Sequence, residues 1–230
     1  MPTNYGSAHP ITAWYLGDTP LTAWRKGATS IWTPNGIHAD FSTYQDGTLD
    51  LSGVWTNDGG SGYDIGVENG LARVLMPDNI PLISSFTRRA RYTAAQHAAD
   101  GYVEIVIGNP GSGNLSTDIF RRATNTSAST AGVGIRLRAS GLYIVRRVSS
   151  TDTEVVPCGS FQGGGRARLT QNGNLHTMHY NGQFVGEWND TAGTALNTSS
   201  ERTLTVVERG YKDVFGPRRF SPSLASIDCT

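Results

Sequence analysis

A close internal repeat near the N-terminus constrains what this chain can fold into more than any other feature. Residues 11–19 (Ile-Thr-Ala-Trp-Tyr-Leu-Gly-Asp-Thr) and residues 21–29 (Leu-Thr-Ala-Trp-Arg-Lys-Gly-Ala-Thr) match at an offset of ten, and Ile31-Trp32 follows. A repeat this close indicates repeated structure. Each unit is a short run of β-forming residues followed by a glycine, which turns readily at positive φ. The repeat therefore predicts two or three short β-rungs.

Rungs of this size cannot fold by themselves, because about 25 residues bury too little apolar surface. Trp14, Trp24 and Trp32 therefore need a surface supplied by the rest of the chain, by further copies of it, or by a larger assembly. We expect residues 1–38 to be an attachment and assembly segment. Its predicted interface residues are Trp14, Trp24, Trp32, Ile11, Leu21 and Ile31.

After Thr33-Pro34-Asn35-Gly36 the pattern changes to short segments with a period of two, which is typical of β-strands. Residues 132–138 and 142–148 read as one hairpin, and residues 102–107 read as a central strand. The Asn-Gly pair between residues 175–180 and 183–188 is the pair that a type I′ turn requires, so these residues predict a second hairpin.

Residues 40–230 hold about 13 or 14 such strands, and Thr93–Gly101 is the only helical candidate. Many short antiparallel strands in one unit favour a two-sheet sandwich. The predicted fold class is an all-β, antiparallel jelly roll over residues 39–230, preceded by the β-repeat segment.

Charge and hydropathy exclude several classes of protein. The 19 basic and 19 acidic residues cancel, which argues against a general nucleic-acid binder. The charge is uneven, however: it sums to −5 over residues 1–85 and to +6 over residues 86–170. There is no apolar run of the roughly 20 residues that a membrane helix needs, and the N-terminus lacks the layout of a signal peptide. We therefore expect a soluble protein, with no membrane insertion and no export by that route.

Several short motifs after residue 39 resemble those of concanavalin A-like (laminin-G-like) jelly rolls. They are Asp40-Phe41, Asp46-Gly47-x-Leu49, Leu51-x-Gly53-x-Trp55, Asn69-Gly70-Leu71-Ala72-Arg73, the hairpin at Tyr180-Asn181-Gly182 and a final strand near Asp228. In such domains the Asn-Gly hairpin and the last strand lie in the same sandwich.

The Trp-x-x-Gly-x-Thr rungs placed before such a domain are similar to minor tail proteins of tailed phages that infect actinobacteria. This resemblance implies a structural virion protein near the tail tip, made in the host cytoplasm and present in several symmetric copies, with the jelly roll facing outward. Its expected partners are other tail proteins, copies of itself and a glycan of the host cell envelope. A capsid-decorating protein or a soluble carbohydrate-binding module with the same fold is the alternative.

Catalytic motifs are missing from the sequence, so we expect no enzymatic activity. Glycoside hydrolases need two carboxylates about 5–10 Å apart, and Glu104 has no acidic neighbour on its own face of the strand. Asp64 and Glu68 are four residues apart, but the glycines around them indicate a hairpin end. His176 and His179 are three apart on a strand and therefore point to opposite faces. A glycan hydrolase is the third possibility, after the phage tail protein and the capsid-decorating protein or soluble carbohydrate-binding module.

Calcium is the one cofactor that deserves consideration, because related jelly rolls sometimes bind it through carboxylates at loop ends. Asp40, Asp46 and Asp228 would converge if the first and last strands pair. No spacing dictates that arrangement, and our prediction is that no cofactor or metal is bound.

The two cysteines, Cys158 and Cys229, are compatible with one disulfide or with two buried free thiols. We prefer two free thiols. No CxxC or Cys/His pattern indicates zinc.

A glycan-binding surface can be proposed from arginine and aromatic residues. Arg136/Arg138 and Arg166/Arg168 have the i, i+2 spacing that puts each pair on one side of a sheet, and arginine's planar fork suits carboxylates and phosphates. The alternative is that these arginines lie on solvated outer faces or bridge to the acidic N-terminal third of another copy. Trp188 and Tyr180 are the candidate platforms for sugar rings.

Overall fold

The computed structural model describes residues 14–16, 19–21, 24–26, 29–32, 36–80, 84–96, 98–124, 131–139, 141–193, 198, 202–213 and 216–230. Within these residues every regular element is a β-strand, except two short 3-10 helices, η1 (Phe41–Thr43) and η2 (Leu49–Ser52). All strand pairs are antiparallel, and two large sheets form a sandwich, which confirms the predicted fold class.

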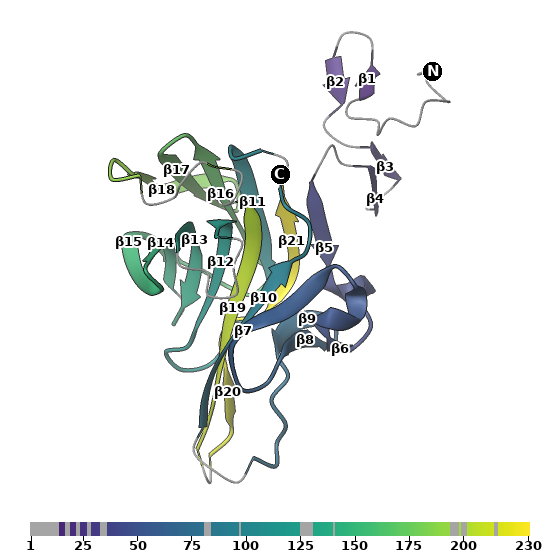
Figure 1. The fold of residues 1–230 in the computed structure, drawn as a ribbon, viewed down its shortest axis with the longest axis vertical. Helices are drawn as coiled ribbons and strands as arrows, with labels where there is room; N and C mark the ends of the chain where they lie inside the picture. The colour runs from purple at the N-terminus through teal and green to yellow at the C-terminus, as the bar shows by residue number, and fades with distance from the viewer. Residues whose placement is uncertain are drawn as a thin grey trace.

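The first sheet has eight strands: β7 (Trp55–Ser61), β10 (Ser84–Tyr92), β12 (Ser116–Ala123), β13 (Ala131–Arg138), β14 (Gly141–Val148), β15 (Thr151–Ser160), β19 (Thr203–Lys212) and β20 (Arg218–Phe220). Their order is β15-β14-β13-β12-β19-β10-β7, and β20 pairs with β19. In Figure 1, β10, β19 and β20 extend downward past the rest of the sheet. The predicted hairpin at residues 132–148 is β13 and β14.

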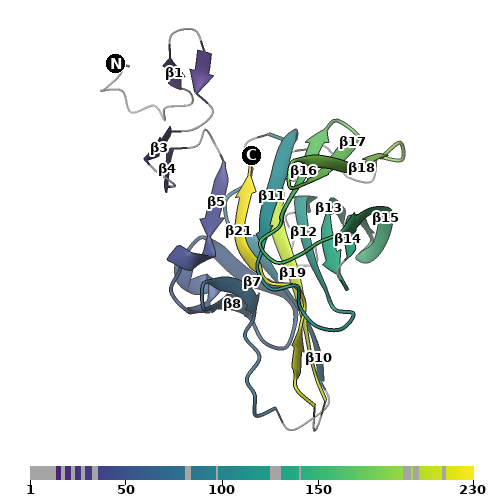
Figure 2. The ribbon, with the colours of Figure 1, turned by 180° about the vertical axis from the view of Figure 1, so that it is seen from behind.

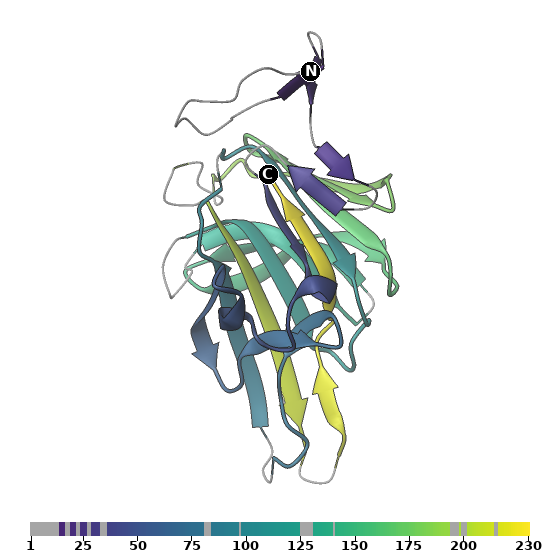
Figure 3. The ribbon, with the colours of Figure 1, turned by 90° about the vertical axis from the view of Figure 1, so that its right-hand side faces the viewer.

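The second sheet has nine strands: β5 (Ile37–Asp40), β6 (Gly47–Thr48), β8 (Ile65–Glu68), β9 (Leu71–Val74), β11 (Gly101–Ile107), β16 (Arg166–Asn172), β17 (Leu175–Tyr180), β18 (Gln183–Asn189) and β21 (Leu224–Cys229). Their order is β18-β17-β16-β11-β21-β9-β8-β6, and β5 pairs with β21. Figure 2 shows β5, β21, β11 and β16 side by side. The predicted central strand is therefore β11, and the first and last strands of the sandwich pair (Figure 3).

The core lies between the sheets and follows from the period of two. Opposed positions of antiparallel strands face the same way, so Ile119, Ile135 and Ile144 form one buried row on the eight-stranded sheet. Ile105 and Ile227 oppose each other on the nine-stranded sheet and are also fully buried. The residues between them in each strand point to the outer faces, where any binding site on a sheet must lie.

The β17–β18 hairpin turns through Asn181 (φ 49°) and Gly182 (φ 81°). Both residues of a type I′ turn need positive φ, which asparagine tolerates and glycine adopts without steric cost. The prediction of this turn is confirmed.

The N-terminal repeat folds into two separate hairpins: β1 (Trp14–Leu16) pairs with β2 (Thr19–Leu21), and β3 (Trp24–Lys26) pairs with β4 (Thr29–Trp32). The first strands begin ten residues apart, and so do the second strands, so the sequence repeat is a repeat of hairpins. Each hairpin is a two-stranded sheet of its own. Of the predicted interface, Ile11 lies outside the described residues and the other five positions are described by their backbone alone, so that interface stays a prediction.

The predicted helix at residues 93–101 does not form in the described part of that segment, which is bends and extended backbone. The physical reason is the buried guanidinium of Arg121, which donates hydrogen bonds to the carbonyls of Ala98, Ala99 and Asp100. The amide of Gln96 donates to Arg202 O instead of to a helical partner. Tertiary hydrogen bonds from a buried charge outweigh the local helix propensity.

Cys158 and Cys229 are both buried and free, which confirms the preferred interpretation. Burial raises the pKa of Cys158 to about 11 and that of Cys229 to about 12. Both thiols are therefore protonated and unreactive at neutral pH.

Candidate functional site

The outer face of the nine-stranded sheet carries an unbroken row of polar and aromatic side chains. The strand register places its members opposite one another in turn, in the order Phe184, His179, Arg168, Glu104, Asp228 and His38. The row crosses six strands, so its length is about 24 Å at 4.8 Å per strand. At its end, His38 Nδ1 lies 2.5 Å from Asp228 Oδ1.

A shallow, open depression of about 370 Å³ lies in this row. We call it the Glu104 depression, and its lining residues are Glu104, Arg166, Arg168, Thr170, His179 and Gly182. Arg166 Nη1 lies 2.5 Å from Glu104 Oε1, and Arg168 Nε lies 2.8 Å from Glu104 Oε2. One carboxylate thus holds two arginines, which are 54% and 42% exposed while Glu104 is 13% exposed.

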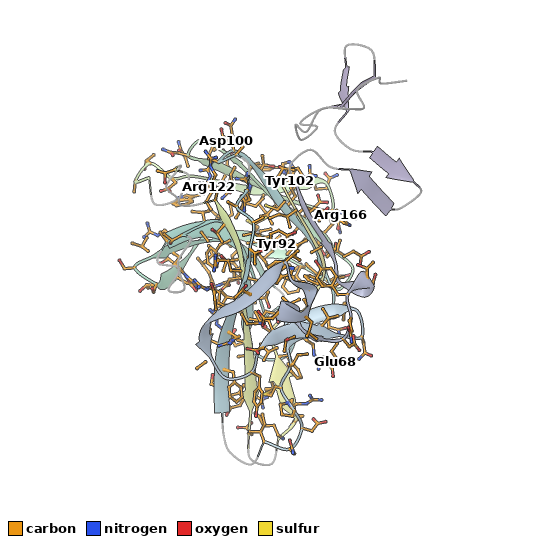
Figure 4. The ribbon with its side chains drawn as sticks, turned by 45° about the vertical axis from the view of Figure 1, so that its right-hand side comes forward. Glu68, Tyr92, Asp100, Tyr102, Arg122 and Arg166 are labelled. Carbon is orange, nitrogen blue, oxygen red and sulfur yellow. The ribbon has the colours of Figure 1, made fainter. Side chains whose placement is uncertain are left out.

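Aromatic rings flank these charges. The Arg168 guanidinium carbon lies 3.9 Å from the centre of the Tyr102 ring, which is a cation–π contact. Phe184 stands edge-on to His179, with ring centres 6.0 Å apart, and is 59% exposed. In Figure 4, Tyr102 and Arg166 lie on the same side of the sandwich, and Asp100 and Arg122 lie at its upper end. The arrangement can donate hydrogen bonds to acceptor oxygens and offers an apolar platform beside them.

Of the predicted glycan contacts, Trp188 and Tyr180 lie elsewhere. Trp188 packs against the core and stacks on the fully buried His176, with ring centres 5.5 Å apart at an angle of 23°. Tyr180 also packs against the core, and its hydroxyl accepts a hydrogen bond from the amide of Gln162. Both side chains support the structure around the β17–β18 hairpin and are not part of the Glu104 depression.

His176 and His179 face opposite sides of the sheet, as predicted. Burial, reinforced by the charge of Arg122, lowers the pKa of His176 to about 4, so its ring is neutral at pH 7. The two imidazoles cannot act together on one ligand.

The second predicted arginine pair, Arg136 and Arg138, lies on the other sheet in a network of ion pairs. Arg136 donates to both carboxylate oxygens of Asp118, at 2.6 and 2.9 Å, and to Asp152. Arg138 donates to Glu154. Arg136 is only 10% exposed, so it is a structural residue of the eight-stranded sheet and not a free cation. The two predicted arginine pairs do not combine into one site.

The same network of ion pairs sets the pKa of Asp118 on the outer face of the eight-stranded sheet. Burial raises the pKa of Asp118, but hydrogen bonds and charges from Arg136 and Arg209 outweigh it, and the pKa is lowered overall. Asp152 pairs with Arg147. A general acid for glycoside cleavage needs a raised pKa. Asp118 is held in the opposite state.

The three calcium candidates do not form a ligand set. The strands of Asp40 and Asp228 pair, as the calcium hypothesis required. However, Asp40 Oδ1 accepts hydrogen bonds from the amide and hydroxyl of Ser42, and Asp228 contacts His38. Among the described residues, no group of three or more His, Cys, Asp or Glu side chains could hold a metal ion.

Sequence reasoning missed Glu104, Tyr102, His179 and Phe184 as site residues. From the sequence, Glu104 is a candidate only for a pair of catalytic carboxylates, and it has no acidic neighbour in its own strand. Its arginine partners lie about 60 residues away in sequence, in the neighbouring strand β16. The alternation of residues 102–106 and 166–170 placed each side chain on a face, but the pairing of the two strands was needed to bring them together.

Comparison with known proteins identifies the fold. No protein-family model and no curated protein sequence matches the chain. Among solved structures, a native glycosidic hydrolase matches with a TM-score of 0.59 at 10% identity, over 85% of this chain and 95% of its own. The carbohydrate-binding module CBM66 from Bacillus subtilis matches with a TM-score of 0.50 at 9% identity, over 76% and 91%. The metal-free carbohydrate recognition domain of Emp46p matches with a TM-score of 0.50 at 12% identity, over 83% and 94%.

These neighbours include a hydrolase and two binding domains, at identities that show the fold alone. No helix in the described part of the chain is long and apolar enough to span a membrane. The sandwich of this chain has the jelly-roll fold that it shares with these neighbours.

Proposed function

We propose that this chain is a non-catalytic structural protein of a phage tail, which displays a jelly roll that binds glycans of the host cell envelope. The N-terminal hairpins attach it to other tail proteins and to further copies of itself. The jelly roll then presents the Glu104 depression outward, so that weak contacts in several copies add up through multivalency.

The observation that carries the binding role is the Glu104 depression itself. Half-exposed arginines that share one carboxylate, in the same row as an exposed aromatic ring, are suited to the hydroxyl, ring and acidic oxygens of a sugar. Sugar-binding sites on sheets are open surfaces of this kind, because a polysaccharide chain must enter from solvent. The jelly-roll fold, which carbohydrate-binding modules also use, is compatible with this role.

The attachment role is supported by the two matching hairpins. A two-stranded hairpin is marginally stable in water and needs another surface to bury its aromatic residues. Three tryptophans in 19 residues meet that description, and aromatic residues are enriched at the centres of interfaces. The similarity of these rungs to minor tail proteins gives the assembly its proposed identity.

A non-catalytic role fits the carboxylates of the eight-stranded sheet. Asp118, Asp152 and Glu154 each pair with an arginine, and the pKa of Asp118 is lowered. Neither property suits a proton donor in glycoside cleavage.

The test is to raise an antibody against the jelly roll and locate it on phage particles by electron microscopy, while measuring binding of the purified chain to host envelope fragments. Label at the tail tip together with binding to the fragments supports the proposal. Label on the head, or tight glycan binding by a monomer that is not a virion component, favours the capsid-decorating or soluble-module alternative. Release of reducing sugar from the fragments would contradict the non-catalytic role.

A further inference from the structure

The charge balance of the Glu104 depression points to a class of ligand. Its six lining residues include two guanidinium groups and one carboxylate, a net charge of +1 with the histidine neutral. One carboxylate serves both arginines, so the depression has a surplus of hydrogen-bond donors. The next carboxylate in the row, Asp228, lies opposite Glu104 and contacts His38. Each guanidinium has five N–H groups, and the bonds to Glu104 use Nη1 of Arg166 and Nε of Arg168.

Glu104 itself shows which shape fits between the arginines. Its two oxygens are divided between them, Oε1 on Arg166 and Oε2 on Arg168. The two arginines stand two residues apart on the same face of β16, and the Arg168 guanidinium lies over the ring of Tyr102. They therefore form a preorganised pair of donors, in which each arginine donates to one of the two oxygens of a planar carboxylate.

The exposure of the partners suggests how a ligand would bind. Glu104 is mostly buried at the floor, whereas the arginines are about half exposed, so their outward N–H groups face solvent. Displacing the mostly buried Glu104 would leave its charge unpaired, so an incoming carboxylate binds to the outward N–H groups while Glu104 keeps its own hydrogen bonds. The exposed ring of Phe184 lies two strand spacings from Arg168 in the same row, about 10 Å away. One oligosaccharide can therefore contact both.

We propose that the Glu104 depression binds an acidic sugar, namely a hexuronic acid residue within a longer glycan. The contact is made through the carboxylate of that sugar. The carboxylate binds to Arg166 and Arg168 alongside Glu104, and a neighbouring sugar ring packs on Phe184. This inference rests on the proposed glycan-binding function and narrows it to one ligand class.

The experiment compares three probes on the full-length chain by isothermal titration calorimetry. The probes are polygalacturonic acid oligosaccharides, the same oligosaccharides with their carboxyl groups reduced to alcohols, and poly(glycerol phosphate). We expect binding of the first that weakens at least tenfold after carboxyl reduction and weakens further as salt screens the charges. Tighter binding of poly(glycerol phosphate) would overturn the carboxylate assignment in favour of phosphate.

Variants locate the site. Arg168→Ala should weaken binding of the acidic probe about 10- to 100-fold, since it removes a hydrogen bond to a charged group. Arg219→Ala is the matched control, because Arg219 is 46% exposed, lies near a carboxylate and faces a tyrosine ring, yet belongs to β20 on the other sheet. Glu104→Gln should strengthen binding about 1.4- to 5-fold by removing the competing charge. Equal losses in the Arg168 and Arg219 variants, or weaker binding by Glu104→Gln, would refute the site.

The outcomes separate this inference from the proposed function. If the reduced, neutral oligosaccharide binds as well as the acidic one and Arg168→Ala abolishes both, the acidic-sugar inference fails and the glycan-binding function stands. If host envelope fragments bind the chain but no variant of the depression affects that binding, the inference fails and the function lies on another surface. If neither the probes nor the fragments bind, both fail.

Discussion

Glu208 gives the most demanding test of the energetics of this fold, because its carboxyl group lies in the core between the two sheets. It is on the core side of β19, fully buried, and neither carboxylate oxygen completes a hydrogen bond. Burial raises its pKa well above the ordinary value, although the backbone of Val74 and the charge of Arg73 partly offset this. Folding therefore favours the neutral, protonated form of Glu208 over the charged form more strongly than water does.

The perturbation is Glu208→Met, an unbranched apolar side chain of similar length. An unsatisfied buried polar group costs about 1–3 kcal/mol, so the variant should be more stable than the parent by about that amount at pH 7. For a chain of this size each kcal/mol corresponds to about 2–4 °C in melting temperature. Glu187→Met is the control, since Glu187 is exposed on β18, and its stability should change by less than about 0.5 kcal/mol.

The pH dependence follows from the sign of the shift. An unfolded glutamate releases its proton near pH 4.3, whereas folded Glu208 releases it at higher pH, so the folded state binds more protons between those two values. Stability of the parent therefore falls as the pH rises from about 4.3 to the folded pKa. The Met variant lacks this fall, and its advantage should grow with pH. Urea unfolding of the parent and the variant at pH 4 to 8 measures this difference in stability. A variant that is no more stable at pH 7, or whose advantage is the same at pH 4 and pH 8, would refute the reasoning.

Three further predictions address the ion pairs and the repeat. Arg136→Met should destabilise the sandwich by about 3–5 kcal/mol in urea at pH 7, because it leaves the buried charge of Asp118 without its main partner; a loss below about 1 kcal/mol would show that Arg209 alone suffices. The lowered pKa of Asp118 adds stability above the unfolded value near 3.9, which is lost as the pH falls through the folded pKa. Asp118→Asn should therefore reduce the acid sensitivity of unfolding, and an unchanged acid limb would contradict it. Trp14→Ala with Trp24→Ala should abolish incorporation into particles without changing the melting temperature of the jelly roll; particles with normal copy number would disprove the attachment role.

Strand positions and faces were predictable from this sequence because they depend on neighbours along the chain. The alternation of residues 132–138 and the Asn-Gly turn at residues 181–182 are local signals, and both gave the observed hairpins. The predicted helix at residues 93–101 was wrong for the complementary reason. Their conformation is set by Arg121, a buried cation on another strand that collects their carbonyl groups, and no local pattern reports such a partner.

The candidate site was half predictable for the same reason. The spacing of Arg166 and Arg168 placed them correctly on one face, but the equal spacing of Arg136 and Arg138 gave no way to tell the two pairs apart. Trp188 is a candidate platform for a sugar ring as an aromatic residue, whereas its position opposite His176 turns it toward the core.

What distinguishes the two arginine pairs is the number of carboxylates that the fold places opposite them. Arg136 meets Asp118, Asp152 and Glu154, is 10% exposed and is held by ion pairs on several sides. Arg166 and Arg168 share Glu104 alone and stay about half exposed. An arginine with carboxylates on several sides stabilises the sheet, whereas a pair that shares one carboxylate keeps N–H groups that can bind an anion from solvent. Because strand order determines this local balance, the same two-residue spacing yields buried structural ion pairs on one sheet and, on the other, a half-exposed pair that we propose as the binding surface.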